Sequence, residues 1–183
     1  MEDRLHSRRS LLRLAGKLLP GLAVAALPLP VLARTYPARR LSFYHTHTGE
    51  TLDVVYAERG YYLSDALSEV NYFLRDFRTG DVHQIDPELL DVLHTAQVYT
   101  GSNGQIEVLS GFRSHATNEQ LRRTGLGVAQ HSLHMTGQAI DIRFADVPTR
   151  TLMRAAISMG RGGVGYYPES DFVHLDTGRV RTW

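Results

Sequence analysis

The amino-acid sequence predicts a single α+β domain with a mostly antiparallel sheet and flanking helices. Segments with a period of two, typical of strands, alternate along the chain with segments whose apolar residues recur at helical spacing. About 150 residues follow a predicted leader, which is a usual length for one domain. The sequence contains no internal repeat, heptad run or low-complexity tract. These observations exclude repeat and coiled-coil architectures and favour one globular core.

The first third of this domain is predicted to be a hairpin and a helix. Residues 40–44 and 50–56 flank a His-Thr-Gly turn and have the composition of two paired strands. Residues 64–77 are predicted to form a helix that Ser64 caps and Gly80 stops. Its apolar face consists of Leu67, Val70, Phe73, Leu74 and Phe77.

A second helix is predicted to begin at Asp86-Pro87, because proline is favoured in the first helical position, and to end at Gly101. Its inward face would be Leu89, Leu90, Leu93 and Ala96. Residues 105–109 read as a strand that leads into Ser110-Gly-Phe-Arg113, and residues 117–123 as a short helix. We expect the helices over residues 64–77 and 86–101 to support the fold and to carry no functional residues.

The last part of the chain is predicted to hold most of the strands. In residues 139–144, polar and apolar side chains alternate as in a half-buried strand, so that Asp141 points away from the apolar face. A helix is predicted over residues 148–159, and strands over 163–167, 172–176 and 179–183. The period of two in residues 172–176 places His174 and Asp176 on the same face of their strand.

Composition excludes some classes of function. The formal net charge of +1 argues against a dedicated nucleic-acid surface, because phosphate binding normally needs a basic excess. The chain has no cysteine, so neither disulfides nor thiolate metal ligands are available. Any bound metal must therefore be held by nitrogen and oxygen atoms.

The N-terminus is predicted to be an export signal. Ser7-Arg8-Arg9-Ser10 resembles a twin-arginine motif, and an apolar run over residues 18–32 follows it. Three prolines make this run too short and too broken for a good membrane span. We therefore predict a signal peptide over residues 1–33 that is cleaved after Ala33, a periplasmic domain over residues 34–183, and no stable membrane anchor. An uncleaved amphipathic anchor is the alternative.

Three side chains are candidates for one zinc site. His134, Asp141 and His174 supply the three protein ligands that a catalytic Zn²⁺ needs, with a fourth position left for water or substrate. On a straight helix His134 and Asp141 would be roughly 10 Å apart along the axis, too far for one ion. We therefore expect the chain to fold back between them, with Gly137 as the turn point.

The pattern Ser-x-His-x-x-Gly-x-Ala-x-Asp over residues 132–141, followed by Asp171-Phe-Val-His174, resembles the zinc D-alanyl-D-alanine peptidases, the VanX-like superfamily. With Ser110-Gly-Phe-Arg113 and residues 162–168 added, the chain is most similar to the murein endopeptidase K branch over residues 41–183. The resemblance implies a Hedgehog/DD-peptidase-like fold, a Zn²⁺ cofactor, and peptidoglycan stem peptides as substrate. It says nothing of protein partners.

The resemblance also implies roles for individual residues. Asp171 stands where VanX-like enzymes carry a glutamate base, and Arg113 matches the arginine that stabilises the oxyanion. His131 or Glu169 could replace Asp171 as the base, and Asp171 could instead cap a turn. Ser132 and Asp176 could orient the ligands. Four histidines outside the motif are expected at the surface: His45, His47, His83 and His94. His115 follows Arg113 closely and is kept as a candidate for substrate contact.

The function predicted from these residues and this resemblance is an exported zinc metallopeptidase that cuts diaminopimelate cross-bridges between peptidoglycan stems. Three alternatives stay open from the sequence. The enzyme could be a D,D- or L,D-carboxypeptidase that trims stem ends. The domain could also bind the cell wall without catalysis, or sense a metal without hydrolysis.

Overall fold

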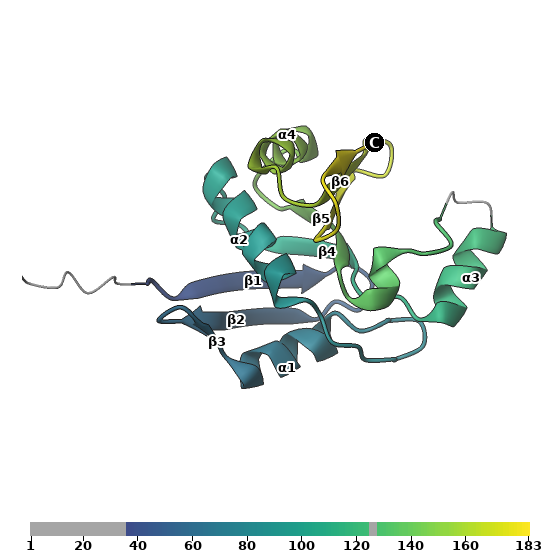
Figure 1. Cartoon of the computed structure of the whole chain (residues 1–183), viewed down its shortest axis with the longest axis horizontal. Coiled ribbons are helices and arrows are strands. Elements are labelled where there is room, and N and C mark those ends of the chain that lie inside the picture. Colours follow the sequence, from purple (N-terminus) through teal and green to yellow (C-terminus); the bar gives the residue numbers. More distant parts are fainter. Residues whose placement is uncertain (1–35, 125–127) are drawn as a thin grey trace, which may run out of the picture. The chain divides into compact units, whose positions relative to one another are not determined.

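The computed structural model describes residues 36–124 and 128–183 (Figure 1). In this part of the chain eight strands form one sheet in the order β3-β2-β1-β4-β5-β7-β6-β8. The strands are β1 (Arg39–His45), β2 (Thr51–Glu58), β3 (Tyr61–Tyr62), β4 (Ile106–Ser110), β5 (Ala139–Phe144), β6 (Gly163–Tyr167), β7 (Phe172–Asp176) and β8 (Arg181–Thr182). Neighbouring strands are antiparallel except for the parallel pairs β1–β4 and β6–β8. The predicted α+β class with a mostly antiparallel sheet is confirmed.

The helices are α1 (Ser64–Phe73), α2 (Pro87–Thr100), α3 (His115–Arg123) and α4 (Thr149–Met159), with a short 3₁₀ helix, η1 (Leu133–Thr136). Three of them, α1, α2 and α4, pack against one face of the sheet. In Figure 1, α2 and α4 lie next to each other; α1 contacts β2, α2 contacts β1, and α4 contacts β5, β6 and β7. The apolar core between helices and sheet includes Phe43, Val54, Ile106, Ile140, Ile142, Val173 and Leu175. The opposite face of β5 and β7 is thereby left for polar side chains.

Several predicted elements are confirmed because local signals specify them. Asp86 caps α2 by accepting a hydrogen bond from the backbone N–H of Glu88 at 3.0 Å, and Gly101 ends the helix in the left-handed conformation. The hairpin β1–β2 and the strands β6 and β7 lie where the alternation of side chains predicts them. The strand predicted over residues 179–183 is shorter, at Arg181–Thr182.

The predicted limits of the first helix were wrong at both ends. Ser64 is the first helical residue and Leu63 occupies the cap position, without a side-chain hydrogen bond. The helix ends at Phe73, although apolar residues continue to Phe77. The backbone carbonyl of Leu74 accepts a hydrogen bond from the N–H of Phe112 at 2.8 Å, so tertiary pairing ends the helix earlier than its periodicity indicates.

The predicted signal peptide over residues 1–33 lies outside the described residues and stays a prediction. Within residues 36–124 and 128–183, no helix is both long enough and apolar enough to cross a bilayer.

Candidate metal centre

Strand register brings two of the predicted ligands together. Asp141 of β5 and His174 of β7 are direct partners across the antiparallel pair, and both side chains point away from the helices. The third residue, His134, lies in η1, just before the chain turns back into β5. Gly137 makes this turn with a φ of 67°, and a Cβ on it would lie 2.1 Å from the carbonyl oxygen of Gln84. The expected fold-back at Gly137 is confirmed.

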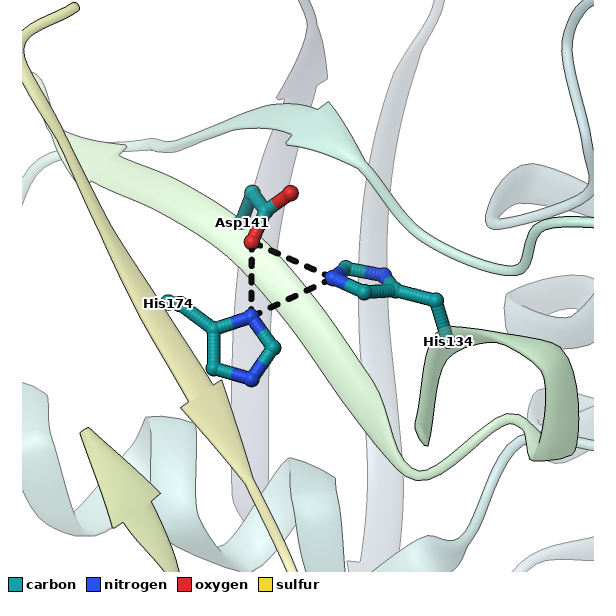
Figure 2. A group of neighbouring side chains, drawn as sticks. All are labelled: His134, Asp141 and His174. Atoms are coloured by element: carbon teal, nitrogen blue, oxygen red, sulfur yellow. Dashed lines mark hydrogen bonds and ion pairs between the residues drawn. The ribbon is translucent and has the colours of Figure 1, made fainter. Parts of the chain in front are cut away.

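Figure 2 shows the three side chains pointing toward one another. The Nδ1 atom of His174 lies 2.8 Å from Oδ1 of Asp141 and 3.2 Å from Nε2 of His134. The Nε2 atom of His134 lies 3.2 Å from the same Asp141 oxygen. All three side chains are buried. Three potential ligand atoms therefore meet at one point inside the protein.

Hydrogen bonds on the far side of each ring determine which nitrogen carries the proton. The carbonyl oxygen of Gly111 can only accept, so Nδ1 of His134, at 2.7 Å from it, donates. In the same way Nε2 of His174 donates to Oδ2 of Asp176, at 3.0 Å. When each ring is neutral, its other nitrogen turns a lone pair toward Asp141. Such outer partners are what orient histidines at metal sites.

The electrostatics favour an ionised Asp141 and a neutral His134, which are the protonation states that metal ligands need. Burial alone would raise the pKa of Asp141, but His134, His174 and the Arg113 guanidinium hold it far below its usual range. Burial lowers the pKa of His134 and keeps it neutral. For His174 burial also acts to lower the pKa, but the carboxylates of Asp141 and Asp176 outweigh it and raise the pKa. Two carboxylates that hold a proton on this ring also attract a metal cation.

The donor set fits a zinc ion. Zinc lies about 2.0–2.1 Å from histidine nitrogen and carboxylate oxygen, so tetrahedral ligands are separated by about 3.3 Å. The observed separations of 2.8–3.2 Å are close to this value. Mixed histidine and carboxylate ligands suit zinc among the common divalent ions.

The three side chains lie at one wall of a pocket of about 650 Å³. Polar walls come from the segments around Arg78, Arg113 and His131, and aromatic walls from Tyr167, Phe172 and Trp183. Trp183 can approach His174, with ring centroids 5.2 Å apart, because Gly165 lies beneath it. A Cβ on Gly165 would lie 2.6 Å from the indole ring. The ligand cluster therefore opens onto a space large enough for a peptide.

The structure places Arg113 beside the ligand cluster. Its guanidinium forms an ion pair with Oδ2 of Asp141, and its Nε donates to Oγ of Ser110 at 2.8 Å. A bulge in β4 between Val108 and Ser110 turns Ser110 to the site face, directly opposite Asp141. The Arg113 side chain is only 12% exposed, so it is a fixed donor at the pocket wall.

The structure does not bring Asp171 into the pocket. This residue has a φ of 49° in the tight turn before β7, and its carboxylate accepts a hydrogen bond from Oγ1 of Thr149 at 2.6 Å, at the start of α4. Its other oxygen lies 3.8 Å from the guanidinium of Arg143. Of the two alternatives for the base, His131 lines the pocket and Glu169 does not.

The other candidates are distributed as follows. Ser132 caps η1 by accepting from the N–H of His134 at 3.3 Å, and Asp176 holds His174, so both orient ligands. His115 is an exposed residue of α3 outside the pocket lining. The half-buried character predicted for β5 was wrong, because every residue except Arg143 is buried.

Sequence reasoning missed three features of the histidines and the pocket. His45 was expected at the surface, but it is completely buried against Phe73 and Phe77, and burial lowers its pKa to about 4. His47 and Arg78 line the pocket although both lie outside the recognised motif. The pairing of β1 with β4 brings the hairpin end close to the arginine loop, and sequence periodicity alone does not reveal that pairing.

Comparison with known proteins gives consistent matches. Residues 33–183 match the family described as peptidoglycan L,D-endopeptidase MepK. The protein of that name from Escherichia coli (strain K12) is 40% identical over 179 residues, which cover 97% of each chain. A probable peptidoglycan L,D-endopeptidase MepK from Haemophilus influenzae is 42% identical, over 88% of this chain and 89% of its own. The crystal structure of Serratia marcescens L-Ala D-Glu endopeptidase ChiX aligns with a TM-score of 0.38 and 23% identity, over 61% of this chain and 86% of that one.

The metal site can be tested by removing one ligand at a time. We expect the protein with residues 34–183 to bind about one zinc ion per chain, and His174→Ala and Asp141→Asn to bind less than about a tenth of that. Asp176→Asn should bind zinc roughly 10–100-fold more weakly, because it frees the His174 ring. Metal content and zinc-dependent thermal stabilisation measure both effects.

His115→Ala serves as the control for these variants, because it removes an exposed histidine outside the pocket. Full zinc content with unchanged affinity in folded His174→Ala would show that the cluster is not the metal site.

Proposed function

Because this chain belongs to the family of peptidoglycan L,D-endopeptidases of the MepK type, we propose that it hydrolyses the peptide cross-links of peptidoglycan as a zinc metallopeptidase. The observation that supports this most directly is the convergence of His134, Asp141 and His174 at the wall of a pocket, next to a fixed arginine. In this proposal these three residues hold the zinc ion.

A zinc ion held there would lower the pKa of a bound water and polarise the scissile carbonyl. Arg113 would stabilise the negative charge that develops on the carbonyl oxygen. Its contacts with Ser110 and Asp141 use two of the five N–H donors of a guanidinium and fix its position. The remaining donors are available for a tetrahedral intermediate, where charge-assisted hydrogen bonds are strong.

We propose His131 as the group that takes the water proton and passes it to the leaving amine. Histidine is the most common general base, and His131 lines the pocket three residues before the ligand His134. Asp171 instead joins the turn before β7 to α4 through Thr149. Asp is well suited to this turn, because it tolerates the left-handed conformation better than most residues.

Digestion of purified, cross-linked sacculi tests the proposed reaction. The zinc-loaded protein should consume cross-linked dimers and release monomers, whereas His174→Ala and a chelated sample should leave the dimers intact. Chromatography with mass spectrometry identifies the products and the bond that is cut. Shortened stems with unchanged dimers would indicate a carboxypeptidase instead. No change despite bound zinc would indicate a wall-binding or sensing domain.

The base can be assigned with two variants that both retain the metal ligands. We expect His131→Gln to lower kcat by at least about 100-fold with normal zinc content. Asp171→Asn should stay within about threefold of the original kcat, because Asn keeps an acceptor for Thr149 and tolerates the positive φ. Single-turnover rates and zinc content are measured for each. A larger loss of kcat in Asp171→Asn than in His131→Gln would instead identify Asp171 as the base.

We also propose that residues 1–33 direct export to the periplasm by the twin-arginine route, which places the enzyme at its peptidoglycan substrate. The support is the Arg8-Arg9 pair before an apolar run over residues 18–32, with a small-residue cleavage site at Ala33. Replacing both arginines by lysine in the full chain should leave the uncleaved protein in the cytoplasm, as fractionation and immunoblotting would show. Unchanged export of that variant would exclude this route.

A further inference from the structure

Arg78 is a cationic side chain of the pocket that the proposed mechanism does not use. It lies in the segment after α1 and contributes to the pocket lining together with Arg113. Its guanidinium lies over the ring of Phe77, 4.2 Å from the ring centre, and this contact directs the side chain. Among residues 36–124 and 128–183, no carboxylate forms an ion pair with it.

A buried carboxylate connects the two arginine-bearing segments. Asp76 has no exposed surface, and it accepts hydrogen bonds from the backbone N–H of Arg78 at 3.0 Å and of Ser114 at 2.9 Å. Ser114 directly follows Arg113 in the chain. Burial acts to raise the pKa of Asp76, but the nearby Thr117 hydroxyl and the hydrogen bonds from the backbone N–H groups of Ser114 and Arg78 lower it, so the carboxylate stays ionised. One side chain thus anchors the backbone at Arg78 and at the residue that follows Arg113.

The two guanidinium groups repel each other across the pocket. Burial and the charge of Arg113 lower the pKa of Arg78, although Asp76 acts in the opposite direction. Asp141 is the sole acidic side chain among the described residues that line the pocket, and it already contacts Arg113 and both histidines. An anion that enters the pocket would therefore meet a guanidinium, that of Arg78, which has no ion-pair partner among the described residues.

The substrate class carries an anion in a suitable place. When one diaminopimelate is linked through the amine of one of its two amino-acid ends, the carboxylate of that end stays free. This carboxylate is attached to the carbon that bears the leaving nitrogen of the scissile amide. It therefore lies next to the reacting atoms, on the side of the leaving group.

We propose that Arg78 is a specificity-determining residue that binds this free substrate carboxylate beside the scissile bond, and that Arg113 binds the carbonyl oxygen. The inference rests on the proposed function and deepens it by assigning a subsite for the leaving-group side. A guanidinium binds a carboxylate through two parallel hydrogen bonds, so position as well as charge contributes to recognition.

Two cross-linked dimers test this subsite in the zinc-loaded enzyme. They have the same cross-link, but in one the carboxylate is free and in the other it is a carboxamide of similar shape. We expect the unmodified enzyme to prefer the free acid by about tenfold in kcat/KM, mainly through KM. Arg78→Gln should reduce kcat/KM about tenfold on the free acid and leave kcat/KM on the carboxamide unchanged, so that the preference disappears. Arg78→Lys should retain part of it, because it keeps the charge without the planar fork.

Arg154→Gln is the matched control, because it removes one positive charge from an exposed position on α4 outside the pocket. It should keep the full preference. Zinc content and thermal midpoint are measured for every variant, and the preference of the unmodified enzyme should decrease with added salt.

The outcomes separate the subsite from the reaction. Equal cleavage of acid and amide by the unmodified enzyme would overturn the subsite and leave the proposed function intact. An equal loss on both substrates in Arg78→Gln, or a loss of zinc, would show a structural role and also overturn the subsite. Cleavage of neither dimer by the unmodified enzyme would overturn the proposed function and the subsite with it.

Discussion

The register between β5 and β7 is the constraint on which the site depends. Asp141 and His174 face each other across this pair, and a shift of either strand by one residue would turn its side chain into the apolar layer beneath the helices. The residues on either side of Asp141 and His174 hold this register, because Ile140 pairs with Leu175 and Ile142 pairs with Val173 in the core. Hydrophobic packing on one face of the sheet thus determines where ligand atoms lie on the other. Metal affinity and core stability are consequently properties of the same strands.

Burying this much charge requires compensation, and the structure provides it as a chain of contacts. Asp141 is ion-paired with Arg113, and His174 is bonded to Asp176, which in turn accepts from Arg181 at 2.7 Å. Asp176 also accepts from two backbone N–H groups, those of Gly163 and Gly178. Unpaired buried charges would be costly, so each carboxylate near the site is held by several donors. The same contacts leave little freedom for the ligand side chains, which prepares the site for a metal.

The parts of the structure that follow from local signals could be predicted from the sequence. The cap at Asp86, the stop at Gly101 and the alternation in β6 and β7 depend on neighbours in the chain, and the ligands lie in a motif with diagnostic spacing. The end of α1, the burial of His45 and the orientation of Asp171 could not be predicted. Each depends on a partner distant in sequence: Phe112 for Leu74, Phe73 and Phe77 for His45, and Thr149 for Asp171. A motif identifies which residue types are present, whereas the backbone turn before β7 decides where an aspartate points.

In this pocket, the residues proposed to hold the metal and the residues proposed to select the substrate lie on different kinds of element. The proposed zinc ligands lie on β5, β7 and η1, whose positions the core determines. Arg78, His131 and the hairpin end at His47 lie on connecting segments at the pocket wall. Sites on strands are held more precisely than sites on loops, and loops vary more readily among related proteins. Substrate preference can therefore change through the loop residues without disturbing the metal centre. The exception is the segment anchored by Asp76, because this carboxylate binds the backbone next to Arg78 and next to Arg113 at once. A change there would displace Arg78 and Arg113 together, so the proposed recognition and the proposed catalysis are coupled through this carboxylate.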